Sequence, residues 1–269
     1  MDKPIVVGYG RSPESDSALR WAVAAAELHR TPLEVLHVLE WPVTTQPGDV
    51  DWITPQQRLE IKSDLEAAVA QAAGTALPVT VVDGPIAAVL CQRSAQSRLV
   101  VMGTHDSGLF PGSLLGSRAL TVAVHAACPV VVVRGEQSGN KLPIVVGIDG
   151  SPQAQRAAQF AFSEAHARQC DVIAIRAWHP QPDPTEELQT AERHELREAL
   201  RDAHSAFPDV AYSLRAVAGK PAKVLVEASG QAQLVVTGSR GMDTFEGLVL
   251  GSVGLRLLHH AHCPVAIVR

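Results

Sequence analysis

The chain has 269 residues, 46% hydrophobic and 19% charged, which suits two ordinary domains with buried cores and excludes a disordered chain. A net charge of −5 excludes an overall positive field that would draw the protein to nucleic acid or to an anionic membrane. No apolar run is long enough to span a bilayer and the first residues lack a secretory-signal pattern, so we expect a soluble, cytoplasmic protein.

One series of elements occurs twice along the chain. The run Ile5-Val6-Val7-Gly8 predicts a buried strand, and Ser12-Pro13 predicts the start of a helix, with serine as the N-cap. The same pattern returns at Ile144-Val145-Val146-Gly147 and Ser151-Pro152, and Thr54-Pro55 opens another helix of the first copy. Residues 136–140 between the copies are polar and contain glycine, as a short linker should. We therefore predict two domains, residues 1–135 and residues 141–269.

Each copy predicts five strands that alternate with helices. In the second copy, Ile144–Ile148, Leu234–Thr237 and Val265–Val268 are almost wholly apolar, as in a parallel sheet covered on both faces. Val172–Ala177 and Ala211–Val217 carry polar residues and are expected nearer an edge of the sheet. The fold class that follows is α/β, with two repeated, open, doubly wound domains.

The loop after the fourth strand of the second copy is rich in glycine. Gly238 and Gly241 permit positive φ and close backbone approach, so that successive N–H groups can point at phosphate oxygens. Gly251 and Ser252 then open the last helix, whose N-terminal amides favour an anion. In this region the candidate ligand residues are Gly238, Arg240, Gly241, Gly251, Ser252 and Val253.

A second candidate loop follows the first strand of the same copy, at Asp149-Gly150-Ser151. If the first and fourth strands are neighbours, both loops meet at the carboxyl edge of the sheet, where ligands of open α/β sheets bind. Asp149 can accept hydrogen bonds from a ribose hydroxyl, or it can hold a divalent cation against a triphosphate.

Other interpretations remain at this point. Glycines after a strand are often turn formers, and the three histidines 259, 260 and 262 lack the ligands that would complete a metal site. Neither a P-loop nor a complete GxGxxG motif is present, which excludes two large nucleotide-binding classes. Trp178 either borders a ligand pocket or packs in the core.

The whole pattern resembles the universal stress protein family in its tandem form. The resemblance rests on a motif that consists of Gly238, two residues, Gly241, nine residues, Gly251 and Ser252. Ile144–Pro152 precedes this motif in the sequence, and Cys263-Pro264-Val265 follows it. It implies a five-stranded parallel sheet of order 3-2-1-4-5 in each copy, with an adenine nucleotide between strands one and four. It also implies that Val130–Val133 pairs with Val265–Val268 to join the domains. For site residues it implies Asp149 near the nucleoside, Gly238, Gly241, Gly251 and Ser252 at the phosphates, and the backbone near Ala177 at the adenine edge.

The first copy departs from the family pattern twice. Gly10 stands where the second copy has Asp149, and Asp106 stands where it has Gly241. A carboxylate about 4 Å from a phosphate costs up to roughly 4 kcal/mol at an effective dielectric constant near 20. We therefore expect ATP to bind mainly to the C-terminal domain, while Arg11 and His105 leave open a different ligand for the N-terminal domain.

These observations predict an ATP-binding regulatory protein of the stress response rather than an enzyme, with Mg²⁺ as a possible companion of the nucleotide. A homodimer is a possible assembly. Two alternatives stay open: a slow ATPase, and an interaction module that binds no nucleotide. No general base opposite the γ-phosphate can be assigned, which argues against efficient hydrolysis.

Overall fold

The computed structural model describes residues 3–40, 53–104, 116–134, 142–178, 186–241 and 250–269, so His105 and Asp106 lie outside the described residues. The elements of the N-terminal half are β1 Ile5–Gly8, α1 Pro13–His29, β2 Leu33–Leu39, α2 Pro55–Ala73, β3 Val79–Asp83, α3 Ile86–Ser94, β4 Leu99–Gly103, α4 Ser117–His125 and β5 Val130–Val133. Those of the C-terminal half are β6 Ile144–Gly147, α5 Pro152–Arg168, β7 Val172–Trp178, α6 Glu186–Ala206, β8 Tyr212–Ala218, α7 Pro221–Ser229, β9 Leu234–Gly238, α8 Ser252–His260 and β10 Val265–Val268.

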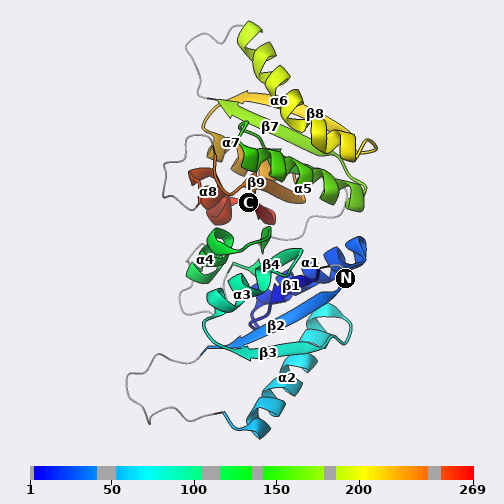
Figure 1. The fold of residues 1–269 in the computed structure, drawn as a ribbon, viewed down its shortest axis with the longest axis vertical. Coiled ribbons are helices and arrows are strands. Elements are labelled where there is room, and N and C mark those ends of the chain that lie inside the picture. The colour runs from blue at the N-terminus through cyan, green and yellow to red at the C-terminus, as the bar shows by residue number, and fades with distance from the viewer. Residues whose placement is uncertain (1–2, 41–52, 105–115, 135–141, 179–185, 242–249) are drawn as a thin grey trace.

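The strands form one ten-stranded sheet in the order β3-β2-β1-β4-β5-β10-β9-β6-β7-β8. Each half therefore has the order 3-2-1-4-5, all parallel, and the predicted fold class is confirmed. The halves meet where β5 and β10 pair antiparallel, with Val132 opposite Val265 and Val130 opposite Ile267. Figure 1 shows the two halves stacked along the long axis of the molecule, with α2 and α6 at its opposite ends.

Local sequence signals explain where the first helix of each half begins. The Ser12 hydroxyl accepts a hydrogen bond from the Ser15 amide, and the Ser151 hydroxyl accepts one from the Ala154 amide at 3.1 Å. Proline follows each serine at a position whose N–H would have no intrahelical partner. Thr54 caps α2 in the same way, so all three predicted helix starts are confirmed.

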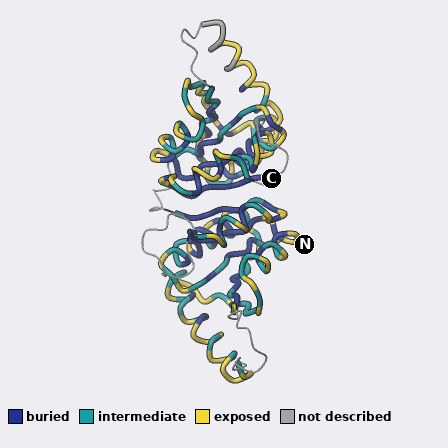
Figure 2. Tube along the Cα trace, turned by 90° about the vertical axis from the view of Figure 1, so that its left-hand side faces the viewer, coloured by how far each residue is buried: buried dark blue, intermediate teal, exposed yellow. Residues whose placement is uncertain are grey.

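Helices cover both faces of the sheet and enclose two apolar layers. The side chains of β1 alternate, with Ile5 and Val7 in the layer beneath α1, α2, α5 and α6, and Val6 in the layer beneath α3, α4, α7 and α8. One face of α5 consists of alanines buried in the first layer, and these small side chains allow the helix to lie close to the strands. Figure 2 shows burial concentrated in the middle of each half, with exposed residues along the outer helices.

Most strand boundaries differ from the prediction by a single residue. The strand predicted at Ala211–Val217 is β8, and it does lie at an edge of the sheet. Trp178 is the last residue of β7 rather than a residue that follows it. Within the described residues, no helix is both long enough and apolar enough to cross a bilayer.

Two arginines, Arg134 and Arg269, link the halves by capping helices across the junction. Arg134 follows β5, and its Nη1 donates to the carbonyls of Leu258 at 2.5 Å and Leu257 at 3.4 Å, near the end of α8. Arg269 follows β10, and its Nη1 donates to the carbonyl of Ala126 at 2.8 Å, the C-cap of α4. Arg134 thus caps the Leu258 carbonyl in the last turn of α8, where the Leu257 carbonyl also accepts from the Ala261 amide, and Arg269 caps the carbonyl at the end of α4.

A buried ionic cluster joins α1 to α5 on one face of the sheet. The Glu164 side chain is 2% exposed, and its Oε1 lies 2.7 Å from Nε2 of His29 while its Oε2 accepts from Nε of Arg168 at 3.2 Å. Arg98 donates to Nδ1 of His29 at 3.1 Å, and because a guanidinium only donates, the ring hydrogen must be on Nε2 and point to Glu164. Arg168 also lies over the ring of Trp21, 5.0 Å from its centroid.

Burial and the neighbouring side chains act on the pKa of Glu164 in opposite directions. Burial by itself raises the pKa of the carboxyl group, but the hydrogen bond from His29 and the charge of Arg168 outweigh burial. The pKa therefore lies below its ordinary value, and Glu164 is a carboxylate at neutral pH.

Candidate functional site

The loops after β6 and β9 meet at the carboxyl edge of the C-terminal half. β6 and β9 are parallel neighbours, with Val146 opposite Val236, so the residues that follow them lie side by side. Asp149 follows β6 and Gly241 follows β9. A Cβ atom built on Gly241 would lie 2.5 Å from Oδ2 of Asp149, closer than non-bonded atoms approach. Glycine at position 241 is therefore required as long as Asp149 keeps this position.

The loop after β6 is fixed by its own side chains. Oδ1 of Asp149 accepts a hydrogen bond from the Ser151 amide at 2.9 Å, which is an Asx turn. Gly150 has a φ of 89°, a left-handed value that favours glycine. Ser151 is 3% exposed and its hydroxyl caps α5, so its hydroxyl already has a structural role. A nucleotide contact by Gly150 or Ser151 stays a prediction.

Gly238 and Gly241 permit a positive φ but do not adopt one, and the glycine of this site with a positive φ is Gly150. Gly238 has a different reason to be glycine. A Cβ atom there would lie 2.9 Å from Cβ of Gln153 and 3.2 Å from the Ala154 amide nitrogen, in the first turn of α5. The absence of a side chain at Gly238 thus lets α5 approach the end of β9.

The first turn of α8 offers amide groups at the same edge. Gly251 is its N-cap and supplies no side-chain hydrogen bond. The Gly251 amide donates to the Ser239 carbonyl at 2.8 Å, and the Ser239 amide donates to the Val268 carbonyl at 2.7 Å, which fixes both ends of the glycine loop. Arg240 and Ser252 are exposed and Val253 is half-buried. Residues 242–249 of this loop lie outside the described residues.

The predicted adenine edge lies on β7. Ala177 is inside this strand, opposite Val217 of β8, rather than after it. Beside it, the indole Nε1 of Trp178 is buried and has no hydrogen-bond partner within the described part of the chain. The structure therefore brings Asp149 and Gly241 into contact and places Gly251 beside them, with Ala177 two strands away from β9.

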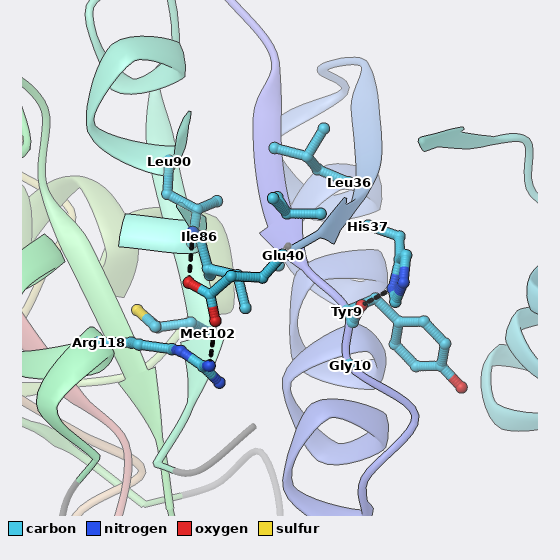
Figure 3. Close-up of a pocket in the computed structure, with 11 residues that line it drawn as sticks. Tyr9, Gly10, Leu36, His37, Glu40, Ile86, Leu90, Met102 and Arg118 are labelled. Carbon is cyan, nitrogen blue, oxygen red and sulfur yellow. Dashed lines mark hydrogen bonds and ion pairs between the residues drawn. The ribbon is translucent and has the colours of Figure 1, made fainter. Parts of the chain in front are cut away.

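The carboxyl edge of the N-terminal half holds a cavity of about 260 Å³. It opens between the ends of β1, β2 and β4 and the starts of α3 and α4, as Figure 3 shows. The residues that line it are Gly8, Tyr9, Gly10, Leu36, His37, Val38, Glu40, Ile86, Leu90, Met102 and Arg118. Of these residues only Gly10 was noted from the sequence. The different ligand left open for this half rested on Arg11, which is not among the lining residues, and on His105, which lies outside the described residues. The available signal was the difference between Arg118 and its repeat counterpart Val253.

The polar groups of this cavity interact with one another. Glu40 forms an ion pair with Arg118, and its Oε1 accepts from the Ile86 amide at 3.3 Å. Nδ1 of His37 lies 2.8 Å from the Tyr9 carbonyl oxygen. Burial, with a hydrogen bond to Asp16, raises the pKa of Tyr9 to about 12, so its phenol remains protonated.

Metal ligands are not grouped in the part of the chain that the structure describes. No set of three or more His, Cys, Asp or Glu side chains is arranged to hold a metal ion among those residues. The His259 and His260 rings lie 6.0 Å apart near the end of α8, and burial lowers the pKa of His259. All four cysteines are free thiols.

Two doubly wound halves that share one sheet, each with its first and fourth strands side by side, define a tandem α/β protein with its candidate ligand sites at the carboxyl edges. The family model described as "Universal stress protein family" matches residues 1–134 and 142–269, and the chain belongs to that family.

Relatives share this organisation over their whole length. A universal stress protein of Mycolicibacterium smegmatis is 35% identical over 98% of this chain and 96% of its own. One from Mycobacterium tuberculosis is 36% identical with the same coverage of both chains. Among solved structures, a universal stress protein from Archaeoglobus fulgidus has a TM-score of 0.71 at 18% identity, covering 99% of this chain and 96% of that one, which shows a common fold.

Proposed function

We propose that this protein is an ATP-binding regulatory module of the stress response, that the nucleotide binds mainly to the C-terminal half, and that it is not an enzyme. The observation that carries the proposal is the contact between the two loops of that half. The Asp149 carboxylate occupies the space that a Cβ atom at position 241 would need. The amides at the start of α8 lie beside these two residues and have no side-chain cap. A phosphate group suits such uncapped amides, because they carry the positive end of the helix dipole.

Each part of ATP has a proposed contact in this site. Asp149 takes the ribose hydroxyls, and the backbone near Ala177 takes the adenine edge. The phosphates lie against the glycine loop of Gly241 and Gly251 and receive hydrogen bonds from the Ser252 and Val253 amides in the first turn of α8. Arg240 is exposed beside the loop and adds positive charge. Gly150, Ser151, Gly238 and Val253 complete the site by shaping the two loops and the first turn of α8.

Magnesium fits the same residues. Mg²⁺ in nucleotide sites is commonly held by one or two carboxylates together with the phosphates and water. Asp149 is a carboxylate at the edge of the proposed phosphate site, so it can supply the protein ligand while the triphosphate supplies others. The ion would neutralise phosphate charge.

The two domains, residues 1–135 and 141–269, are proposed to stay joined through β5 and β10 in solution. Their regulatory role requires that ATP stabilise one arrangement of the protein over another, since a ligand shifts an equilibrium only by its differential affinity. A cytoplasmic location and a homodimer are parts of the same proposal.

The first test identifies the ligand and measures its affinity. The purified protein is denatured, the released small molecules are identified by mass spectrometry, and ATP is titrated calorimetrically into the stripped protein. We expect ATP in the released fraction. In Asp149→Asn, which keeps an oxygen that can accept from the Ser151 amide, we expect at least tenfold weaker binding.

The matched control is Asp16→Asn, which alters an acidic residue in the first turn of α1 in the other half. This variant should bind ATP as the wild type does. Release of ADP with measurable turnover would instead support an ATPase, and a protein that neither releases nor binds a nucleotide would leave only the interaction module.

A further inference from the structure

The cavity of the N-terminal half differs in chemistry from a phosphate site. Leu36, Val38, Ile86, Leu90 and Met102 supply apolar side chains to its wall. Its volume of about 260 Å³ lies just below the range of pockets that hold drug-sized molecules, so it suits a smaller ligand. An apolar wall of this kind favours a molecule that does not need to keep its hydration shell.

The charged groups at the mouth of the cavity already neutralise each other. One oxygen of Glu40 pairs with the Arg118 guanidinium, and the other accepts from the backbone amide of Ile86, the first residue of α3. Figure 3 shows the Glu40 side chain lying between these two donors. An arginine and a helix N-terminal amide are the donors that an anionic ligand would use, and the protein's own carboxylate occupies both.

The repeat shows that this arrangement is specific to the N-terminal half. At the position of Arg118 the second copy has Val253, so the cation is absent there. At the position of Met102 it has Thr237, so this position of the cavity wall is more apolar in the N-terminal half. A further difference is Gly10, which stands where the second copy has Asp149.

We propose that the N-terminal half has a ligand site of its own for a small, uncharged, largely apolar molecule, and that Glu40 excludes phosphates by occupying the anion-binding position with its own carboxylate. The ligand class is an aromatic or aliphatic molecule about the size of a bicyclic ring. The site is independent of the C-terminal nucleotide site, and either half can bind its ligand if the other fails.

The chain offers a direct probe of this site. It contains three methionines, Met1, Met102 and Met242, of which Met102 lines the cavity and Met242 follows Gly241 in the sequence. In protein labelled with ¹³C at the methionine methyl groups, each residue gives one NMR signal. Indole, a neutral bicyclic probe, should shift the Met102 signal in a saturable way and leave the other two in place, whereas inorganic phosphate should leave the Met102 signal unchanged.

Two variants test the role of Glu40. Glu40→Gln frees Arg118 from its counter-ion, and inorganic phosphate should then shift the Met102 signal in a saturable way at concentrations that leave the wild-type signal unchanged. In Glu40→Gln/Arg118→Val, which also removes the cation, that response should disappear. Thermal unfolding of both variants checks that they are folded.

Several results would overturn the proposal. One is a Met102 signal that indole leaves unmoved up to its solubility limit, because this measurement uses the wild-type protein and depends on no variant. Another is a phosphate response as strong in the wild type as in Glu40→Gln. Failure of the ATP proposal would be seen separately, as an absence of calorimetric binding with the indole response intact.

Discussion

Asp149 and Gly241 share a space that holds only one side chain. The N-terminal half has the same two residue types in exchanged positions, with Gly10 after β1 and Asp106 after β4. In the sequence, the exchange keeps one aspartate and one glycine at this pair of positions in each half.

The first prediction follows from this contact. In Gly241→Asp a second carboxylate is forced against Asp149, and its charge also opposes phosphate at the proposed site. We expect ATP affinity to fall at least tenfold and the melting temperature to fall as well, measured by calorimetric titration and thermal unfolding.

The double variant Asp149→Gly/Gly241→Asp separates the two effects, because it reproduces the pair of the N-terminal half. Its melting temperature should recover toward that of the wild type while ATP affinity stays low. If ATP bound to this variant as tightly as to the wild type, the assigned role of Asp149 would be wrong.

At the scale of single elements, α4 and α8 depend on a residue from the opposite half for the end of each helix. Arg134 and Arg269 reach across the β5–β10 junction to the last carbonyls of these helices. A hydrogen bond from a charged donor contributes about 1.5–3 kcal/mol to the free energy of unfolding, and this contribution is lost when a half-buried carbonyl loses its donor. Helix termination is therefore coupled to the pairing of the halves.

The second prediction tests that coupling. Arg134→Met keeps much of the side-chain length but removes the donors to Leu257 and Leu258. We expect a loss of about 2 kcal/mol, which lowers the melting temperature by roughly 4–8 °C. The matched control is Arg20→Met, since Arg20 is exposed and donates to Ser17 within its own helix; it should change stability little.

Helix starts and central strands could be predicted because their sequence signals are local. Serine or threonine followed by proline marked three helix starts, and short apolar runs marked the central strands, because both patterns act over a few residues. The role of Gly238 was not predictable, because it depends on how closely α5 approaches β9. The cavity also escaped prediction, since Glu40 and Arg118 are 78 residues apart in the sequence and meet only in the folded sheet.

At the scale of the whole molecule, the buried cluster around Glu164 ties the stability of the paired halves to pH. The carboxylate belongs to α5, His29 and Arg98 belong to the N-terminal half, and Arg168 shares a helix with Glu164. Because the pKa of Glu164 is lower in the folded chain than in the unfolded chain, its contribution is complete above the unfolded value of about 4.3. That contribution is lost as the pH falls through the folded value.

The third prediction is a difference in pH profiles. Glu164→Gln should be less stable than the wild type by about 3 kcal/mol at pH 7, because Arg168 loses its buried counter-ion. The difference should close as the pH falls below about 4, where the wild-type carboxyl group is protonated on unfolding. Glu227→Gln, at an exposed pair with Lys223, is the matched control and should track the wild type at every pH. A gap between Glu164→Gln and the wild type that stays constant down to pH 2 would contradict this account.

The central claim is that two halves of one fold have different ligand chemistry, with the nucleotide in the C-terminal half. Native mass spectrometry of the intact chain titrated with ATP tests it most directly, since it counts bound molecules per chain and also reads the number of chains in the assembly. We predict that one ATP per chain binds to saturation before a second adduct forms. Two adducts that accumulate with equal affinity, or a chain that stays free of ATP, would contradict it.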